Sequence, residues 1–194
     1  MFKLLLGLVA AACLCGGQAD KCEAQSANQD QERYAVYSVV LDRMFVREST
    51  KLLVIQDKTG DDFTDNAEQR WENIRKKLAP ISQKTIEDFK SRNSQPSSLE
   101  NKFTLTTKVT FISKSEVDKM FGKGGGWWEA FYKRYPNSPG LITLSNIGFN
   151  SEMTEALLYV GHGCGGLCGQ GNYVLLVKTN GTWRLERQVM TWIS

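Results

Sequence analysis

The side chains best suited to redox or metal chemistry lie in one short segment, residues 161–171. The segment contains His162, which is the only histidine, and Cys164 and Cys168, two of the five cysteines. Six of its residues are glycines, which implies positive φ angles or close backbone approach at several places. Thiolates and neutral imidazoles act as nucleophiles, bases and metal ligands. Three interpretations of this segment are therefore possible: a structural disulfide, a metal site, and redox or nucleophilic chemistry at sulfur.

The first interpretation is a structural disulfide between Cys164 and Cys168, and the sequence favours it. Glycines allow so short a ring to close, and an oxidising environment would favour it if the chain is exported, as its N-terminal residues indicate below. A metal site would have only three ligands, His162 and the two cysteines, and oxidation would compete for the thiols. A redox pair or a cysteine nucleophile with His162 as its base lacks both a visible carboxylate partner and the Cys-x-x-Cys spacing. We predict no metal, no cofactor and no catalytic residue.

The same segment connects two predicted strands and is longer than an ordinary hairpin requires. Two to five residues suffice for most hairpin connections, and loops on a rigid scaffold often carry function. We therefore predict a binding loop, and its candidate contact residues are His162, Gly163, Gly165, Gly166, Leu167 and Gln170.

The N-terminus has the features of an export signal. Lys3 supplies a positive charge, residues 4–12 form an apolar run too short to cross a bilayer, and small residues stand at the positions that a signal peptidase reads, 17 and 19. We predict a signal peptide over residues 1–19 and a mature protein that is periplasmic or secreted. The alternative is a degenerate lipobox that ends at Cys13, which would leave a lipid anchor on that cysteine.

Residues 20–33 are polar and lack periodicity, so we predict a flexible lead-in to the domain. Cleavage after Ala19 leaves three cysteines, an odd number, in the mature protein. If Cys164 and Cys168 pair, Cys22 is free and could link two chains.

The remaining residues, 34–194, have the length of a single domain. Apolar residues at helical spacing predict a helix from Tyr34 to Phe45, a second helix that ends before Pro80 and a short third one after it. Strand patterns occupy residues 52–55 and 103–111. Ser113 and Glu116 then match a capping box at the start of another helix.

The helix expected from Trp127 to Tyr135 carries a wide aromatic stripe. Large aromatic side chains are most often buried, so the simplest interpretation is a helix that faces the core. A platform for a carbohydrate or a peptide is the alternative. The stripe consists of Trp127, Trp128, Phe131, Tyr132 and Tyr135.

From residue 141 onward the pattern predicts only strands and turns. Asn180-Gly181 is a strong signal for a two-residue hairpin, and short connections make neighbouring strands antiparallel. We predict an α+β fold, in which helices pack on a mainly antiparallel sheet that ends in a four-strand meander. The four strands are residues 141–147, 155–160, 173–178 and 182–193. Even spacing predicts that one face of the last strand holds Trp183, Leu185, Val189 and Ile193.

Composition excludes several classes of protein. The net charge is +3, and its 24 basic residues are scattered through the chain, whereas nucleic-acid binders usually concentrate them in a stripe. No run of about 18 apolar residues follows the N-terminal stretch. We expect no nucleic-acid partner and no membrane span.

From Trp128 to its end, the chain resembles a family of exported bacterial proteins of unknown function. The resemblance rests on the Gly148-Phe149-Asn150 motif and on the motif YVGxxCGxLCGxG, which begins at Tyr159. It implies an envelope or secreted location, and it brings no activity, cofactor or catalytic residue.

These observations lead to a hypothesis of function. We expect an exported, non-enzymatic domain that binds a ligand or a protein partner in the cell envelope. The alternative is a thiol- or metal-dependent enzyme that uses His162, Cys164 and Cys168. A third option is an inhibitor of a secreted hydrolase.

Overall fold

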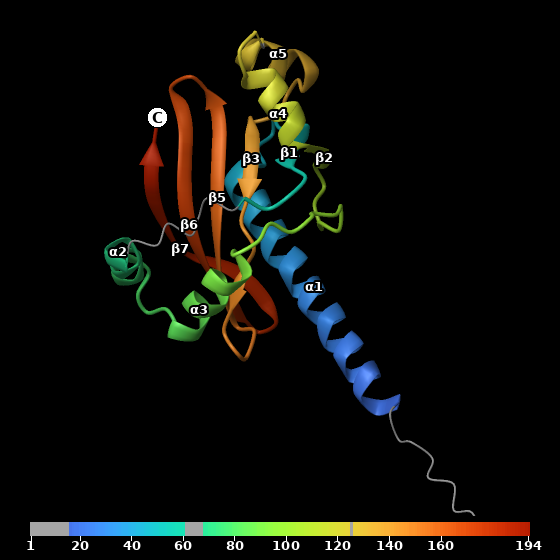
Figure 1. The fold of residues 1–194 in the computed structure, drawn as a ribbon, viewed down its shortest axis with the longest axis vertical. Helices are drawn as coiled ribbons and strands as arrows, with labels where there is room; N and C mark the ends of the chain where they lie inside the picture. Colours follow the sequence, from blue (N-terminus) through green and yellow to red (C-terminus); the bar gives the residue numbers. More distant parts are fainter. Residues whose placement is uncertain (1–15, 61–67, 125) are drawn as a thin grey trace, which may run out of the picture.

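The computed structural model describes residues 16–60, 68–124 and 126–194. Within these residues, five helices and seven strands form the predicted α+β fold (Figure 1). Residues 1–15, which include most of the predicted signal peptide and the alternative lipid anchor at Cys13, lie outside the described residues.

The strands form one mixed, mostly antiparallel sheet in the order β2-β1-β3-β5-β6-β7, and β4 pairs with β5 outside this path. β1 is parallel to both of its neighbours, β2 and β3, and every other pair is antiparallel. The predicted C-terminal meander is confirmed as β3, β5, β6 and β7. The strands are β1 (Leu52–Gln56), β2 (Lys108–Ile112), β3 (Leu141–Leu144), β4 (Gly148–Phe149), β5 (Glu155–Gly165), β6 (Cys168–Thr179) and β7 (Thr182–Ile193).

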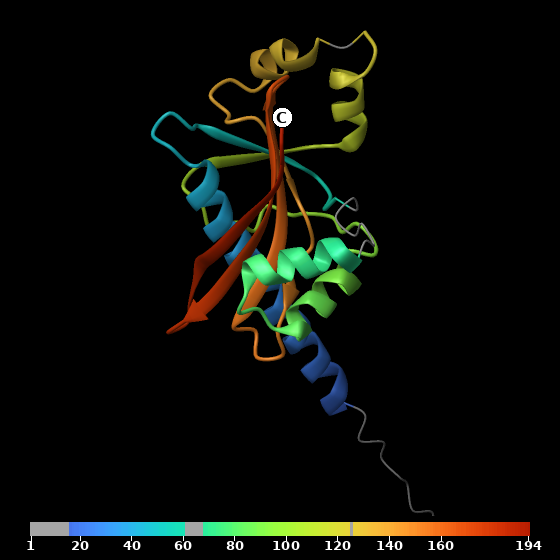
Figure 2. The same ribbon diagram turned by 90° about the vertical axis from the view of Figure 1, so that its left-hand side faces the viewer.

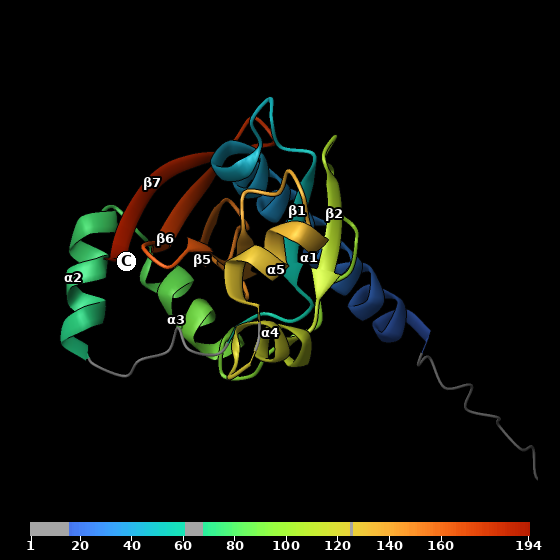
Figure 3. The same cartoon turned by 90° about the horizontal axis from the view of Figure 1, so that it is seen from above.

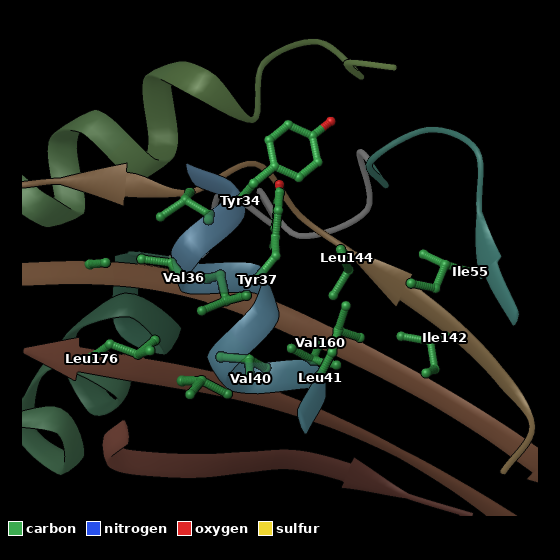
Figure 4. Close-up of a cluster of buried hydrophobic side chains, with 14 of the residues drawn as sticks. Tyr34, Val36, Tyr37, Val40, Leu41, Ile55, Ile142, Leu144, Val160 and Leu176 are labelled. Atoms are coloured by element: carbon green, nitrogen blue, oxygen red, sulfur yellow. The ribbon is translucent and has the colours of Figure 1, made fainter. Parts of the chain in front are cut away.

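Helix α1 (Gly16–Phe45) lies across one face of the sheet and forms a core with it. Tyr37, Val40 and Leu41 are fully buried against side chains of β1, β3, β5 and β6, as Figure 4 shows. The Tyr37 hydroxyl also donates a buried hydrogen bond to the carbonyl oxygen of Ser145, at 2.7 Å. The apolar periodicity from Tyr34 onward therefore predicted the packed face of this helix correctly.

The flexible lead-in predicted for residues 20–33 is absent from the structure, because α1 includes all of these residues. Where side chains of this segment are described, at residues 27–33, several of their contacts are polar, which residue spacing does not reveal. Glu32 accepts hydrogen bonds from Lys178 Nζ at 2.5 Å and from Trp183 Nε1 at 2.6 Å, and Asp30 pairs with Lys102 Nζ at 2.8 Å. Without a proline, such a polar segment can extend a helix that packing has already stabilised. The first turns of α1 project past the sheet (Figure 1).

Helices α2 (Glu68–Leu78) and α3 (Gln83–Arg92) cover the opposite face, as the view from above shows (Figure 3). Trp71 and Phe89 pack there against alternate residues of β5, β6 and β7. On β5, Leu157 faces these helices whereas Leu158 faces α1. The long β5–β6 hairpin is therefore buried on both sides over much of its length.

Helices α4 (Lys114–Phe121) and α5 (Trp127–Arg134) lie at the end of the sheet where the β5–β6 hairpin turns (Figures 1 and 2). α4 begins with the predicted capping box, in which Ser113 and Glu116 bond each other's backbone N–H groups. Phe131 of α5 is fully buried and packs in a third core cluster with Val54 and Ile112. This packing fixes α5 beside the end of the hairpin.

Two predictions about strands need correction. The strand predicted over residues 103–111 is shorter, since β2 begins only at Lys108. The single buried face predicted for the last strand is wrong, because β7 has register shifts against β6 that leave Glu186 and Thr191 without cross-strand partners. Each extra residue moves the following side chains to the other face, so Trp183 packs with α1 whereas Val189 packs with α2 and α3. The predicted two-residue turn at Asn180 and Gly181 is confirmed by the positive φ of both residues, 50° and 77°.

Candidate functional site

Residues 161–171 are the end of the β5–β6 hairpin and not a long loop. Gly161 pairs with Gly171, His162 with Gln170 and Gly163 with Gly169, so only residues 166–167 remain for the turn. Cross-strand pairing satisfies the backbone hydrogen-bond groups of this segment, which a free loop would leave to water. Among the predicted contact residues, only Gly166 and Leu167 therefore lie in a loop, and the others are strand residues.

Cys164 and Cys168 form the predicted disulfide, which spans this turn with Cα atoms 5.0 Å apart. The strands are irregular at this point, because the register shifts between Gly163 and Gly165. From α5, the Tyr132 hydroxyl donates a hydrogen bond to the carbonyl oxygen of Cys164, at 2.9 Å. The turn is therefore fixed both by a covalent bond and by a neighbouring helix.

His162 and Gln170 form one row across the hairpin and face the C-terminal end of α1. The imidazole ring of His162 lies 5.0 Å from the ring of Phe45, the last residue of α1. Its Nε2 atom is 2.9 Å from the carbonyl oxygen of Pro139. Because a carbonyl only accepts hydrogen bonds, Nε2 carries the proton, and in the neutral ring Nδ1 is an acceptor.

Burial lowers the pKa of His162 from its ordinary value of 6.5, and the hydrogen bond to Pro139 partly opposes this effect. The ring is therefore neutral at neutral pH. It borders a cavity of about 300 Å³ together with polar and apolar neighbours from α1, from β6 and from two surface segments. These neighbours are Met44, Phe45, Arg47, Ser49, Thr50, Asn137, Ser138, Pro139 and Gln170.

The opposite face of the hairpin end is made of glycine, and aromatic side chains cover it. A Cβ atom on Gly163 would lie 3.1 Å from the Trp128 ring, and one on Gly169 would lie 3.0 Å from the Trp192 ring. A Cβ atom on Gly171 would overlap both the Tyr159 hydroxyl and the Trp192 indole nitrogen. The glycines are thus required for close approach of tryptophan to the backbone.

Trp192 is held on this glycine face by a hydrogen bond. Its indole Nε1 donates to the Tyr159 hydroxyl at 2.6 Å, and that hydroxyl lies 3.3 Å from Thr191 Oγ1. The sequence analysis did not identify this arrangement. Its signal is the recurrence of glycine at every second position on both sides of the turn, which is the period of a strand.

The aromatic stripe of α5 faces the core only in part. Phe131 and Tyr135 are buried, and Trp128 packs on the hairpin, but Trp127 is 60% exposed. Trp127 is the first residue of the helix and has a positive φ of 50°. Its indole therefore belongs to the surface beside the hairpin and not to the core.

The residues proposed for a thiol- or metal-dependent enzyme are arranged differently from what that chemistry needs. The two sulfur atoms are joined to each other, and His162 is bonded to Pro139. Throughout the part of the chain that the structure describes, no group of three histidine, cysteine or acidic side chains is placed to hold a metal ion. Cys22 belongs to α1, in a part where side chains are not described.

Comparisons with family models, with curated proteins and with solved structures find no match for this chain. The resemblance of residues 128–194 to exported bacterial proteins therefore stays a prediction. No helix among the described residues has both the length and the apolar character that a membrane span requires.

The disulfide is expected to stabilise the domain only modestly, because it closes a very small ring. Replacing both cysteines, Cys164→Ser with Cys168→Ser, should lower the free energy of unfolding by about 2 kcal/mol or less. Denaturant unfolding measures this difference, and Cys22→Ser serves as the control. Intact-mass analysis without reductant should find residues 164 and 168 oxidised, and two free thiols there would contradict the assignment.

The glycine face predicts different effects for two glycines that pair with each other. Gly171→Ala should displace Trp192 and lower the free energy of unfolding by about 1–3 kcal/mol, since the new methyl group has no room. Gly161→Ala should be nearly neutral, because the nearest atom, in Thr143, is 3.6 Å from the new Cβ. Tryptophan fluorescence and denaturant unfolding test both variants, and equal effects would argue against the glycine face.

The lowered pKa of His162 makes stability depend on pH. In the acidic range the unfolded chain binds a proton at this position more readily than the folded protein does. The free energy of unfolding should therefore fall as the pH drops from about 7.5 to about 5, and it should fall less in His162→Gln. Since the chain has no other histidine, parallel curves for the two proteins would contradict this assignment.

Proposed function

We propose that this chain is an exported, non-enzymatic binding domain that contacts a protein partner in the cell envelope through the hairpin end of its sheet. The observation that carries the proposal is where its exposed apolar side chains lie. Among the described residues, the large apolar side chains that are exposed are Trp127, Leu167, Met190, Trp192 and Ile193. We call these five residues the apolar end.

The members of the apolar end come from three parts of the chain and lie at one end of the sheet, Trp192 on the glycine face and Ile193 on the face of Gln170. Leu167, which is 92% exposed, forms the turn of the hairpin. Ile193 pairs with Gln170, and Trp192 with Gly171, so the end of β7 lies beside the start of β6. Trp127 begins α5, whose next residue, Trp128, contacts the hairpin. In Figure 1 the hairpin turn, α5 and the end of β7 all lie in the upper part of the molecule.

Contact with a protein partner would explain why these large apolar side chains are exposed. Single exposed apolar residues are ordinary, whereas a group of them on one region is typical of a contact surface. Tryptophan is also among the residues that contribute most to binding energy in protein interfaces. The disulfide and the Tyr132 hydrogen bond hold the turn in place, which lowers the entropy lost on binding.

The enzyme alternative has less support than binding. A joined pair of sulfur atoms supplies no thiolate, and His162 is directed to a carbonyl oxygen. The export signal predicted over residues 1–19 and the resemblance of residues 128–194 to exported proteins support the proposed envelope location. An inhibited hydrolase would be one kind of partner that fits the same surface.

Site-specific photo-crosslinking in intact cells tests the proposal. A photoreactive amino acid at position 167 should give a discrete adduct with another protein, because Leu167 is the most exposed member of the apolar end. The matched control is position 180, in the turn at the opposite end of β6, which should give none. Ile193→Ser should reduce the adduct at position 167 about tenfold, as expected for loss of an apolar contact in an interface.

Two outcomes would overturn the proposal. Adducts of equal yield from positions 167 and 180 would show that the hairpin end has no special role. Absence of any adduct at position 167, in cells that export and oxidise the protein, would contradict the proposal that this surface has a protein partner.

A further inference from the structure

The cavity beside His162 adjoins the apolar end, although the proposed function makes no use of it. His162 on β5 pairs with Gln170 on β6, and Gln170 pairs with Ile193 on β7. Residues that pair directly across antiparallel strands have side chains on the same face, so these three form one row. His162 and Gln170 border the cavity, and Ile193, which is 73% exposed, belongs to the apolar end. The row therefore leads from the proposed contact surface into the cavity.

Several polar groups around the cavity are already bonded within the domain. The guanidinium group of Arg47 donates to three carbonyl oxygens at the C-terminal end of α1. The Thr50 hydroxyl donates to the carbonyl oxygen of Phe45, and the Ser138 hydroxyl donates to that of Tyr135. These bonds hold the walls of the cavity, and a ligand has to bind the groups that remain.

Four polar groups of the lining have no hydrogen-bond partner within the described part of the chain. They are the side-chain amides of Asn137 and Gln170, the hydroxyl of Ser49 and the Nδ1 atom of His162. Asn137 and Ser49 are exposed, and Gln170 is half-buried. Nδ1 of His162 is not one of the side-chain atoms that are buried without a partner. All four groups are therefore accessible to a ligand.

The charge and the bonding capacity of these groups indicate what kind of ligand fits. None of the described residues that line the cavity is acidic, and the single cation, Arg47, is directed to carbonyl oxygens. Side-chain amides and hydroxyls both donate and accept, whereas Nδ1 of the neutral His162 ring only accepts. This mixed set suits an uncharged ligand that carries both donors and acceptors. Every peptide group except that of proline has one of each.

We propose that the cavity receives a short, extended segment of the partner protein, whose peptide groups bond to Gln170, Asn137 and His162 Nδ1. This inference rests on the proposed function and states what the partner presents. One amide side chain can accept from a peptide N–H and donate to a carbonyl oxygen. A volume of about 300 Å³ is at the lower end for ligand sites, which suits a few residues of extended chain.

Ile193 favours a peptide over a sugar, which also carries donors and acceptors. Neighbouring strands lie about 4.8 Å apart, so a backbone bound over Gln170 would have its side chains within reach of Ile193. An apolar side chain of the segment would then cover Ile193, which is otherwise exposed.

Crosslinking from the edge of the cavity separates this inference from the proposed function. A photoreactive amino acid at position 48, between the lining residues Arg47 and Ser49, should capture the same protein as position 167. An adduct at position 167 with none at position 48 would overturn this inference and leave the proposed function intact. An adduct at position 48 alone would support the cavity and contradict the role of the apolar end, and absence of both would overturn both.

A binding experiment with purified protein tests the chemistry of the ligand. The probe is a pool of hexapeptides of serine, threonine, leucine and valine with blocked ends, and the readout is the side-chain amide NMR signals of Gln170 and Asn137. We expect saturable shifts, and the same pool with N-methylated peptide groups should bind about tenfold more weakly, because its N–H donors are lost. No saturable shift, equal binding of the methylated pool, or shifts with the disaccharide cellobiose alone would each overturn the proposal.

Matched variants show whether the Gln170 amide itself binds the peptides. Gln170→Leu should weaken binding of the hexapeptide pool about two- to tenfold, as expected for loss of neutral hydrogen bonds. Gln95→Leu is the control, since Gln95 is exposed and does not line the cavity, and it should leave binding unchanged. Denaturant unfolding verifies that both variants fold. Equal binding by the two variants would contradict the role of Gln170 and overturn the proposal.

Discussion

The antiparallel pairing of β5 with β6 is the constraint on which the other elements depend. Ten residue pairs join these strands, from Glu155 with Val177 to Gly165 with Cys168. Because successive side chains point to opposite faces, Leu158 packs under α1 whereas Leu157 packs under α2 and α3. A one-residue slip would exchange these two sets of side chains. The positions of three helices therefore depend on the register of one hairpin.

The same pairing also determines what the hairpin presents at its end, where α5 and the last residue of α1 contact it. One face places His162 beside Gln170 and borders a cavity, and the other face is glycine under tryptophan and tyrosine. The glycine content of residues 161–171 is thus explained by packing on one face of a strand. The disulfide closes the turn between the two faces.

Elements whose packing is apolar and regular could be predicted from the sequence, and this includes the packed part of α1, the capping box at Ser113 and the C-terminal meander. The extension of α1 over residues 20–33 could not be predicted, because the described contacts of Asp30 and Glu32 there are polar and leave no apolar periodicity. Which side chains of β7 face α1 and which face α2 and α3 could not be predicted either, because the register shifts against β6 cannot be recognised from the spacing of residues. Of the candidate site, the Cys164–Cys168 pair was predictable from compartment and spacing, whereas the tryptophan cover depends on contacts across the fold.

The two register shifts in β7 affect whether the edge of the sheet can pair with other chains and aggregate. β7 is at an edge of the sheet, and a straight edge strand with apolar residues invites further strands to add and so promotes aggregation. Here the unpaired Glu186 and Thr191 interrupt the edge, and bulges twist an edge away from such pairing. The chain can therefore expose Met190, Trp192 and Ile193, as the proposed function requires, without offering a continuous template to copies of itself.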